Sequence, residues 1–387
     1  MQLDLSEEER AFRDEMREFF TTKVSEEIRE AVAAGRELSK DQLVESMRTL
    51  NAAGLAVPRW PVEHGGQDWT EIQFHIWHEE MERACVPTPL AFNAGMIGPV
   101  IAHFGTDEQK KEFLPKTANI DIFWSQGFSE PDAGSDLASL RTTAVKDGDD
   151  WIVNGQKTWT TLGQYGDWIF TLVRTDPDAK KQAGISMLLI DMESEGLEVR
   201  PIQLIDGGHE VNEVWFEDVR VPGENLVGEL NGGWTIAKFL LGNERVGVAP
   251  SGITKRVIAR IKGLAEDRFT DDPLLRARIA ELENELLALE LTTMRVAANS
   301  VDGKPHPASS VLKLKGSELQ QAVSELVLDL AGPAGLASGA RDEEADSDLD
   351  AWERLAAPLY LNLRKASIYG GSNEVQRQII SRGILGL

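Results

Sequence analysis

The chain has 387 residues, of which 42% are hydrophobic and 27% are charged, and its formal net charge is −24. This length exceeds the size at which a single hydrophobic core stops growing, so two or three folding units are expected. The acidic balance argues against nucleic acid as a partner, because phosphate binding needs a basic surface. The sequence holds no run of about 18 apolar residues, so we expect no membrane-spanning segment.

Cysteine content and the first residues indicate the compartment. The only cysteine is Cys85, which rules out an internal disulfide and suits a reducing environment. The sequence starts directly with an acidic helical pattern and lacks the basic region and apolar run of a signal peptide. We therefore expect a cytoplasmic protein. No residue is assigned to a metal site.

The first 120 residues are predicted to be mostly helical. Ser6 and Glu9 form the pattern of a capping box, and apolar residues follow at helical spacing. Further helices are expected over three stretches, residues 40–53, 69–83 and 107–116.

The character of the chain changes near residue 120. Residues 151–161 predict a β-hairpin that turns at Asn154 and Gly155, because an Asn-Gly pair accepts the positive φ angles of a type I′ turn. Short apolar runs separated by turn residues extend this region into an antiparallel sheet or barrel. These runs are residues 168–173, 185–190 and 214–216.

From Trp234 onward the pattern is helical again. Asp272 and Pro273 have the character of an N-cap and a first helical residue. The apolar stripe that follows is expected to form core or a subunit interface: Leu275, Ile279, Leu282, Leu286 and Leu289. Residues 339–350 are acidic and predict a mobile surface loop, and a last long helix is expected to include residues 361–369.

The order of elements predicts an α+β protein with three domains. An N-terminal α-helical domain is expected over residues 1–120, a middle antiparallel β domain over residues 121–230 and a C-terminal helical bundle over residues 231–387.

Two stretches of the β region carry the strongest functional signal. Residues 127–136 read Gly-Phe-Ser-Glu-Pro-Asp-Ala-Gly-Ser-Asp, and residues 154–161 read Asn-Gly-Gln-Lys-Thr-Trp-Thr-Thr. Glycines let the backbone approach a ligand, hydroxyls bond ring heteroatoms, and tryptophan offers an apolar surface. Together the stretches predict a flavin platform. For either stretch alone, a hairpin of an ordinary β domain is an equal alternative.

Two further regions offer chemical groups. Glu244, with Arg245 beside it, lies in a largely apolar helix, where a desolvated carboxylate is a stronger general base. A solvent-facing Glu/Arg pair is the alternative. Near the C-terminus Gly370 and Gly371 interrupt a helix, and Ser372 can cap the next one, whose N-terminus favours a phosphate.

In this order and spacing the motifs resemble those of the acyl-CoA dehydrogenase family over nearly the whole chain. The matching stretches are residues 58–66, 129–136, 154–159 and 369–377. The resemblance implies that the C-terminal domain is a four-helix bundle and that FAD lies between it and the middle domain.

The resemblance also implies site residues by position. Phe128 and Ser129 would meet the flavin ring, with Trp159 and Thr161 on its other side, while Ser135 would contact the acyl-CoA substrate.

The implied reaction is α,β-desaturation of an acyl-CoA thioester to the trans-2-enoyl-CoA. A base removes the α-proton while a hydride leaves the β-carbon for flavin N5, and the electrons pass to an electron-transfer flavoprotein. The N–H of Gly370 would polarise the thioester carbonyl. Ser372 and Glu374 match positions that hold the adenosine and phosphate part of FAD.

One departure from the family pattern concerns the base. Many members carry it as a glutamate just before the glycine of the C-terminal motif, where this chain has Gly370. A minority branch supplies it from a helix of the bundle, and Glu244 matches that location. The resemblance therefore implies Glu244 as catalytic base, with Arg245 at the substrate.

A second departure concerns the cofactor. Homotetrameric members clasp the FAD of a neighbouring subunit with Arg-x-x-Phe-Gly and Gln-x-x-Gly-Gly motifs. Only residues 267–271 stand near the first position, and at the second Asp329 replaces the glutamine and Pro333 a glycine. Aspartate repels a pyrophosphate, and proline lacks an N–H donor. We expect a tetramer, most simply an α2β2 heteromer in which a related small subunit supplies the missing contacts.

Within the family the pattern is closest to the large subunit of pimeloyl-CoA dehydrogenases, and subunits of steroid side-chain acyl-CoA dehydrogenases are the neighbouring group. One alternative is an acyl-CoA or nitroalkane oxidase, which shares the fold but admits oxygen. Another is a flavin-poor subunit that only stabilises a catalytic sibling. Glu244 and the intact residues 127–136 favour the dehydrogenase.

Overall fold

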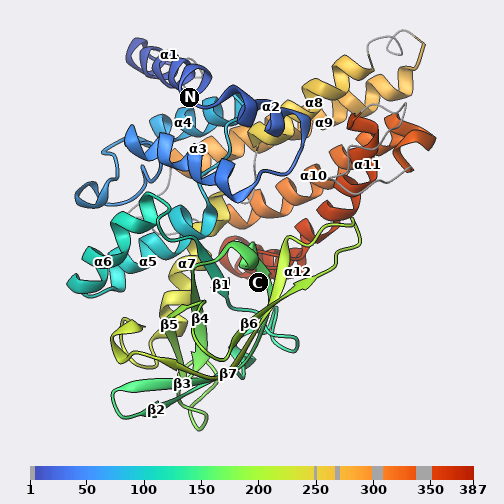
Figure 1. The fold of residues 1–387 in the computed structure, drawn as a ribbon. Coiled ribbons are helices and arrows are strands. Elements are labelled where there is room, and N and C mark those ends of the chain that lie inside the picture. Colours follow the sequence, from blue (N-terminus) through green and yellow to red (C-terminus); the bar gives the residue numbers. More distant parts are fainter. Residues whose placement is uncertain (1–4, 248–250, 266–270, 299–307, 337–350) are drawn as a thin grey trace.

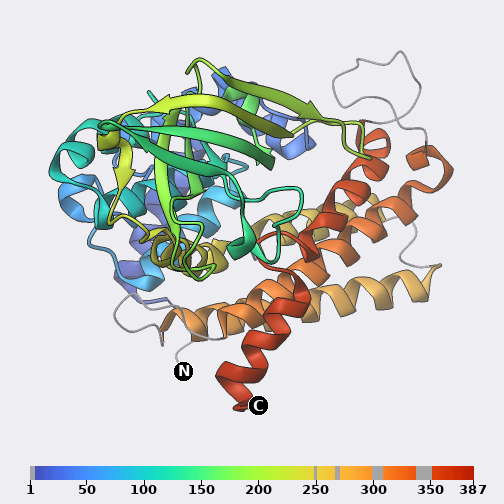
Figure 2. The same ribbon diagram turned by 90° about the horizontal axis from the view of Figure 1, so that it is seen from below.

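The computed structural model describes residues 5–247, 251–265, 271–298, 308–336 and 351–387. Among these residues no helix combines the length and the apolarity that crossing a membrane requires. The sheet occupies one end of the molecule and helices the other, as Figure 1 shows. Figure 2 views the sheet from below, with the C-terminal helices running past it.

The N-terminal part is helical, as predicted. Its helices are α1 (Glu7–Thr22), α2 (Glu26–Ala34), α3 (Lys40–Ala52), α4 (Glu71–Arg83), the π-helical η2 (Ala91–Ile97), α5 (Gly98–Phe104) and α6 (Asp107–Ala118). The predicted capping box is confirmed, because the Ser6 hydroxyl accepts from the Glu9 N–H while the Glu9 carboxylate accepts from the Ser6 N–H.

The middle part is one mixed sheet with the strand order β6-β7-β3-β2-β4-β5-β8, and β1 pairs with β4. Its strands are β1 (Trp124–Gly127), β2 (Thr143–Asp147), β3 (Asp150–Thr161), β4 (Trp168–Arg174), β5 (Ile185–Asp191), β6 (Leu197–Ile202), β7 (Val211–Val221) and β8 (Leu226–Val227). Phe170 and Leu172 pack toward the N-terminal helices, whereas Ile169 and Val173 pack in a core on the opposite face. The central strands are therefore buried on both faces.

The predicted turn at Asn154 and Gly155 is wrong. The hairpin turns at Gly148, because β2 and β3 pair from Asp147 opposite Asp150. Asn154 and Gly155 instead form an irregularity inside β3, where the pairing with β7 shifts register. The physical reason is shared backbone chemistry, since a β-bulge and a type I′ turn both favour residues that tolerate positive φ.

The C-terminal part returns to helix, so the predicted order of helical, β and helical parts is confirmed. The sheet is mixed and not purely antiparallel as predicted, because β4 pairs in parallel with β1 and β2. Its helices are α7 (Gly233–Gly247), α8 (Ser251–Leu264), α9 (Pro273–Ala298), α10 (Ser309–Ala331), α11 (Ala351–Asn362), the 3-10 turn η8 (Leu363–Ser367) and α12 (Asn373–Ile380). The predicted N-cap is also confirmed, because Asp272 accepts from the backbone N–H groups of Leu274 and Leu275. The α9 stripe packs in a core of the helical part.

Of two further predictions about this region, one is wrong in part and the other is not tested. The helix expected over residues 361–369 ends early, because α11 stops at Asn362 and η8 continues as a tighter turn. The loop predicted over residues 339–350 lies outside the described residues.

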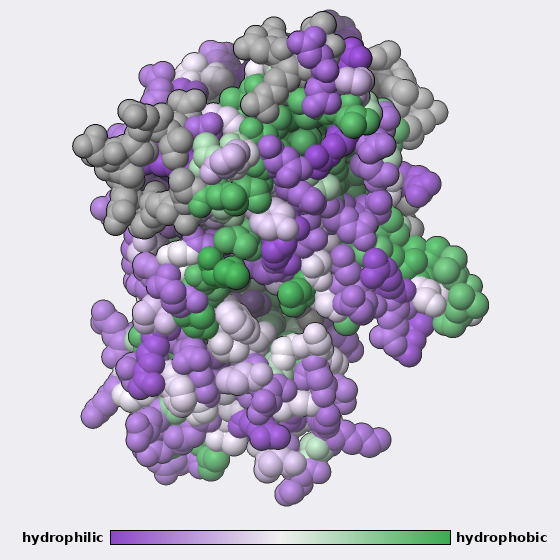
Figure 3. Space-filling view, turned by 90° about the vertical axis from the view of Figure 1, so that its right-hand side faces the viewer, coloured by the Kyte–Doolittle hydropathy of each residue, from purple (hydrophilic) through white to green (hydrophobic). Residues whose placement is uncertain are grey.

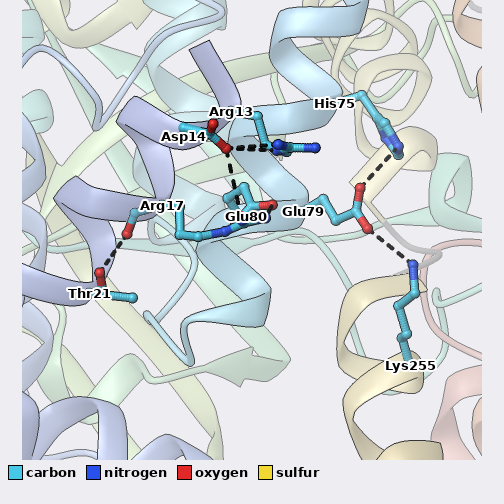
Figure 4. A network of polar contacts seen from close by, with 8 residues as sticks. All are labelled: Arg13, Asp14, Arg17, Thr21, His75, Glu79, Glu80 and Lys255. Atoms are coloured by element: carbon cyan, nitrogen blue, oxygen red, sulfur yellow. Dashed lines mark hydrogen bonds and ion pairs between the residues drawn. The ribbon is translucent and has the colours of Figure 1, made fainter. Parts of the chain in front are cut away.

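A polar network joins the N-terminal helices to the C-terminal ones. The Arg17 guanidinium on α1 donates to both carboxylate oxygens of Glu80 on α4, each at 2.8 Å. The preceding residue on α4, Glu79, accepts from Lys255 of α8 at 3.0 Å, and Lys255 also reaches Glu290 of α9 at 3.0 Å. Figure 4 shows Lys255 and His75 approaching Glu79 from opposite sides.

Candidate functional site

The first component of the site is the segment that follows β1. The Phe128 ring is buried and lies edge-on to Phe170, with ring centroids 5.7 Å apart. The carbonyl of the next residue, Ser129, accepts a hydrogen bond of 2.9 Å from the Thr158 N–H of β3. The structure thus brings the two predicted motifs together, because residues 128–129 are tied directly to the middle of the second motif.

Trp159 projects from β3 at a second irregularity of the strand. The pairing of β3 with β7 shifts register between Lys157 and Thr160, and Trp159 has a φ of 61°. Such a conformation is uncommon for a bulky residue, and a bulge re-aims the side chain. The indole is 57% exposed, so it offers an apolar surface to a ligand. We call Phe128, Ser129, Trp159 and Thr161 the β wall.

A buried ion pair lies beneath the β wall. The Lys157 side chain is fully buried, and its Nζ donates to the Phe128 carbonyl at 3.2 Å and to Glu130 at 2.8 Å. Burial lowers the pKa of Lys157 to about 8, against the opposing effect of the Glu130 charge. Burial by itself raises the pKa of Glu130, but the charge and hydrogen bond of Lys157 outweigh it and lower that pKa. Each group of this 2.8 Å pair therefore stabilises the charged form of the other against the effect of burial.

The second component, which we call the C-terminal wall, is residues 370–374. Gly370 and Gly371 adopt φ angles of 62° and 82°, a region that favours glycine. The Gln376 amide donates to both of their carbonyls, at 3.0 and 3.2 Å. Ser372 caps α12 as predicted, accepting from the Val375 N–H. Hydrogen bonds from its own backbone and from Ser372 lower the pKa of the exposed Glu374, which is therefore ionised.

Three contacts of the loop between β6 and β7 connect the end of β3 with the segment that precedes the C-terminal wall. The Leu162 N–H, just after β3, donates to the Glu210 carbonyl at 2.7 Å, and the Glu210 carboxylate forms an ion pair with Lys365 of η8. Beside it, Asn362 donates to Asp206 at 2.7 Å. The loop between β6 and β7 therefore links the two walls within one chain.

Glu244, expected as the base, and Arg245, expected at the substrate, are placed only by their backbone. Glu244 and Arg245 lie in the last turns of α7, and their side chains lie outside the described part of the chain. Leu240 and Ile236 are buried in the core that α7 shares with the N-terminal helices. Because Glu244 follows Leu240 by four residues, it belongs to the same face of the helix. Ser135 lies exposed in the loop after β1.

A cavity of about 300 Å³ lies between α4 and α8. Its lining is mainly apolar, from residues 86–91 and Ile253, with Glu82 and Arg256 as charged members. The segment continues into η2, where Phe92 contacts Phe170, and Phe170 in turn contacts Phe128. An aromatic series therefore runs from the vicinity of the cavity to the β wall.

Family models cover nearly the whole length. The model of the acyl-CoA dehydrogenase N-terminal domain matches residues 6–121, that of the middle domain residues 125–219, and that of the C-terminal domain residues 231–385. The chain belongs to the acyl-CoA dehydrogenase family. The enzyme class expected from the motifs is thereby confirmed, and the family is one of flavoprotein oxidoreductases.

Relatives and solved structures agree with this membership. The chain is 38% identical over 346 residues to the acyl-CoA dehydrogenase IpdE1 of Mycobacterium tuberculosis, covering 87% of this chain and 86% of the relative. It is similar to a chain of the ChsE4-ChsE5 complex from Mycobacterium tuberculosis, with a TM-score of 0.86 and 32% identity over 100% of this chain and 99% of that one.

Two further solved structures are similar over the whole chain. A chain of the Tcur3481-Tcur3483 steroid ACAD has a TM-score of 0.86 and 29% identity, over 100% of this chain and 99% of that one. A chain in a structure of the electron transferring flavoprotein of Acidaminococcus fermentans has a TM-score of 0.81 and 25% identity, over 100% of both chains.

Two residues at the expected cofactor-clamp position can be placed in the structure. Asp329, where the family motif has glutamine, lies near the end of α10 and forms an ion pair of 2.7 Å with Arg278 of α9. Pro333 lies in the turn that follows α10. Of the other motif position, residues 267–271, all but residue 271 lie outside the described part.

Sequence reasoning assigned no role to Lys157 or Glu130, although both belong to the motifs. The sequence signal that could have found them is the alternation of side chains along β3. It places Lys157 on the same face of the strand as Val153, and both side chains are buried. A lysine at a buried strand position requires a partner, and Glu130 is the acidic residue of the other motif.

Proposed function

We propose that this chain is a catalytic, FAD-binding subunit that oxidises an acyl-CoA thioester to the trans-2-enoyl-CoA. The observation that carries the proposal is the β wall. Trp159 stands out of a strand at positive φ, beside the Ser129 backbone that β3 holds in place. More than half of the indole is exposed, so it contributes little to the core and offers the flat apolar surface that a flavin ring needs.

The polar groups of the β wall and of the C-terminal wall match the polar groups of FAD. Ser129 and Thr161 are half-buried hydroxyl residues near Trp159, and hydroxyls bond the heteroatoms of a flavin ring. The first turn of α12, capped by Ser372, favours a phosphate. Glu374 is ionised at the same turn, so it suits a ribose hydroxyl of the adenosine better than a phosphate. When bound, FAD supplies the two-electron acceptor of the reaction.

We assign Glu244 as the catalytic base. It lies on the face of α7 whose preceding residues, Ile236 and Leu240, are buried. A carboxylate shielded from water removes an α-proton more readily than a hydrated one. Arg245 and Ser135 are assigned to the substrate, and the Gly370 N–H to the thioester carbonyl, where it would stabilise the developing enolate charge.

Anaerobic mixing with acyl-CoAs tests this assignment. The visible flavin absorbance of the wild type is expected to bleach, and Glu244→Gln is expected to bleach roughly 10²–10⁴-fold more slowly, the usual contribution of a general base. Glu281→Gln, on the exposed side of α9, is the matched control and should bleach at the wild-type rate. Undiminished bleaching by Glu244→Gln contradicts the base assignment, and a wild type that no acyl-CoA bleaches contradicts the proposed reaction.

The acyl group is proposed to extend toward the cavity between α4 and α8. Support comes from the aromatic series that connects the vicinity of that cavity with Phe128. The similarity to the steroid ACAD supports a bulky acyl group, whereas the motif pattern supports pimeloyl-CoA. A panel of short-chain, pimeloyl and steroid acyl-CoAs separates these substrates by their bleaching rates.

We propose an electron-transfer flavoprotein as the acceptor of the electrons. The similarity to a chain in the structure of the Acidaminococcus fermentans electron transferring flavoprotein supports this partner. Rapid reoxidation of the reduced enzyme by air would favour the oxidase alternative instead. The cytoplasmic location expected from the single cysteine stays a prediction.

We also propose an α2β2 assembly with a related subunit. Support comes from Asp329 and Pro333 in place of the family's cofactor contacts and from the similarity to a chain of the ChsE4-ChsE5 complex. The surface in Figure 3 carries apolar patches between polar side chains. On α9 an exposed apolar stripe consists of Leu287, Leu291 and Met294. Full FAD occupancy in the chain purified alone would contradict the heteromer, and FAD bound only by the partner would favour the flavin-poor alternative.

A further inference from the structure

The buried pair beneath the β wall reaches the backbone that the ligand would meet. Lys157 and Glu130 come from the two motifs, and Lys157 has no exposed surface. Besides the carboxylate, the Lys157 Nζ donates to the Phe128 carbonyl at 3.2 Å. A hydrogen bond from a charged, buried donor holds a carbonyl more firmly than one made in water.

The Glu130 carboxylate fixes the other end of the pair. Its Oε1 accepts from Lys157 and from the Thr142 N–H, each at 2.8 Å, and its Oε2 accepts from the Arg141 N–H at 2.6 Å. The Glu130 backbone exchanges two hydrogen bonds with Ala133, of 3.2 and 3.0 Å. One carboxylate therefore cross-links the loop, the start of β2 and the middle of β3.

These contacts determine how two successive peptide planes are turned. The Phe128 carbonyl points toward Lys157 and the Ser129 carbonyl toward the Thr158 N–H, both on β3. In a trans peptide the C=O and the following N–H point in opposite directions. Because Lys157 holds the Phe128 carbonyl, the Ser129 N–H is directed away from the buried pair. The contacts with Lys157 and Thr158 thus fix the orientation of the Ser129 N–H and side chain.

We propose that the Glu130–Lys157 pair positions the flavin-facing peptide of Phe128 and Ser129, so that Lys157 is a positioning residue for the dehydrogenation. The inference rests on the proposed function for the identity of the ligand. For stability alone the pair has no evident advantage, because a buried ion pair is often replaceable by apolar residues of similar volume without loss. An apolar pair, however, could not hold the Phe128 carbonyl.

Three variants separate positioning from stability. Lys157→Met removes the donor to Phe128 and leaves Glu130 charged. Glu130→Gln keeps that donor. The double variant Glu130→Gln/Lys157→Met removes the donor but leaves no unpaired charge. Lys146→Met, on the exposed strand β2, is the control. Thermal unfolding, hydrogen exchange of peptides covering residues 127–131 in the apoprotein, and FAD affinity of the purified assembly are measured for each.

The double variant is expected to regain most of the melting temperature that Lys157→Met loses, because no charge is left unpaired. In both variants that lack Lys157, exchange over residues 127–131 should be faster and FAD affinity weaker, each by about tenfold or more, the effect of one charged hydrogen bond. Glu130→Gln keeps the Lys157 amine that donates to the Phe128 carbonyl but lowers the pKa of Lys157 further, so FAD affinity should fall less than in the variants that lack Lys157.

The opposite pattern overturns the inference. If the double variant recovers wild-type exchange and FAD affinity together with its melting temperature, the pair is merely structural. Should Lys157→Met not fold, the double variant alone decides between the two outcomes. The exchange measurement needs no cofactor, so it remains decisive even if the wild type binds no FAD, a result that would contradict the proposed function instead.

Discussion

At the residue scale, Trp159 is the most unusual position of the site. A left-handed backbone costs a residue with a Cβ about 1–2 kcal/mol, and such strain persists only where neighbouring contacts impose it. Here the neighbours are Thr158, bonded to Ser129, and Thr160, which pairs with Asn212 of β7. The strand is held on both sides of the bulge, and the indole is turned outward. The strained conformation therefore does not bury the indole in the core, as expected for the proposed contact with a flavin ring.

The first prediction follows from this exposure. Trp159→Asn should leave the free energy of unfolding within about 1 kcal/mol of wild type, because asparagine tolerates the left-handed conformation and little buried area is lost. FAD affinity should fall at least about tenfold with the loss of the apolar surface. Urea unfolding and FAD titration measure the two quantities. Trp151→Asn, buried in the same strand, should instead cost about 3–5 kcal/mol. Equal stability losses in both variants would refute the assignment.

At the element scale, the approach of α4 and α8 shapes the cavity. Gly252 lies at the start of α8, and a Cβ there would stand 1.9 Å from the Glu82 carboxylate of α4. The glycine therefore permits a contact between these helices that a larger residue would prevent. Arg256, one turn further along α8, donates to the Glu82 carbonyl at 2.6 Å. The space left beside this contact is lined by Ile253.

A second prediction tests whether this space receives the acyl group. Ile253→Trp fills part of the cavity, so it should lower kcat/KM for bulky acyl-CoAs by roughly 10–200-fold relative to short-chain ones, the scale at which an apolar pocket discriminates. Steady-state rates with matched substrates measure the ratio. Val145→Trp, on the exposed strand β2, should leave the ratio unchanged. A uniform loss for all chain lengths would place the acyl group elsewhere.

At the scale of the whole molecule, the network of Figure 4 couples the N-terminal and C-terminal helices. Burial lowers the pKa of His75 below 6.5, despite the nearby Glu79 charge. Burial raises the pKa of Glu79, but Lys255 and His75 outweigh it, so that pKa falls below 4.5. Burial also opposes the charge of Lys255, yet its bonds to Glu290 and Glu79 raise that pKa above 10.5. The ion pair between Glu79 and Lys255 is therefore fully charged at pH values between the pKa of Glu79 and the pKa of Lys255.

A third prediction gives the sign of the pH dependence. With the pKa values of His75 and Glu79 both lowered, the unfolded chain binds more protons than the folded one in acid. The free energy of unfolding should therefore fall as the pH drops below 6.5, and fall further below 4.5. Urea unfolding across this range measures the slope. Removal of the Glu79 charge lowers the pKa of His75 further, so Glu79→Gln should flatten the slope only below about 4.5. Glu71→Gln, from an exposed pair on the same helix, should not. An unchanged slope in Glu79→Gln would contradict this account.

Sequence by itself was sufficient wherever the signal is local. Helix caps at Ser6 and Asp272, the apolar stripe of α9 and the order of helices and strands all depend on residues a few positions apart. The motifs were likewise sufficient for the family, which the family models confirm.

Features that depend on pairing between distant segments could be determined only from the tertiary structure. Asn154 and Gly155 suit a turn or a bulge equally, and the pairing of β3 with β7 makes them a bulge. The same pairing turns Trp159 outward, and the fold brings Lys157 to Glu130, 27 positions away in the chain. Local propensity is a property of a few neighbouring residues, whereas register and burial are set by the strand that lies alongside.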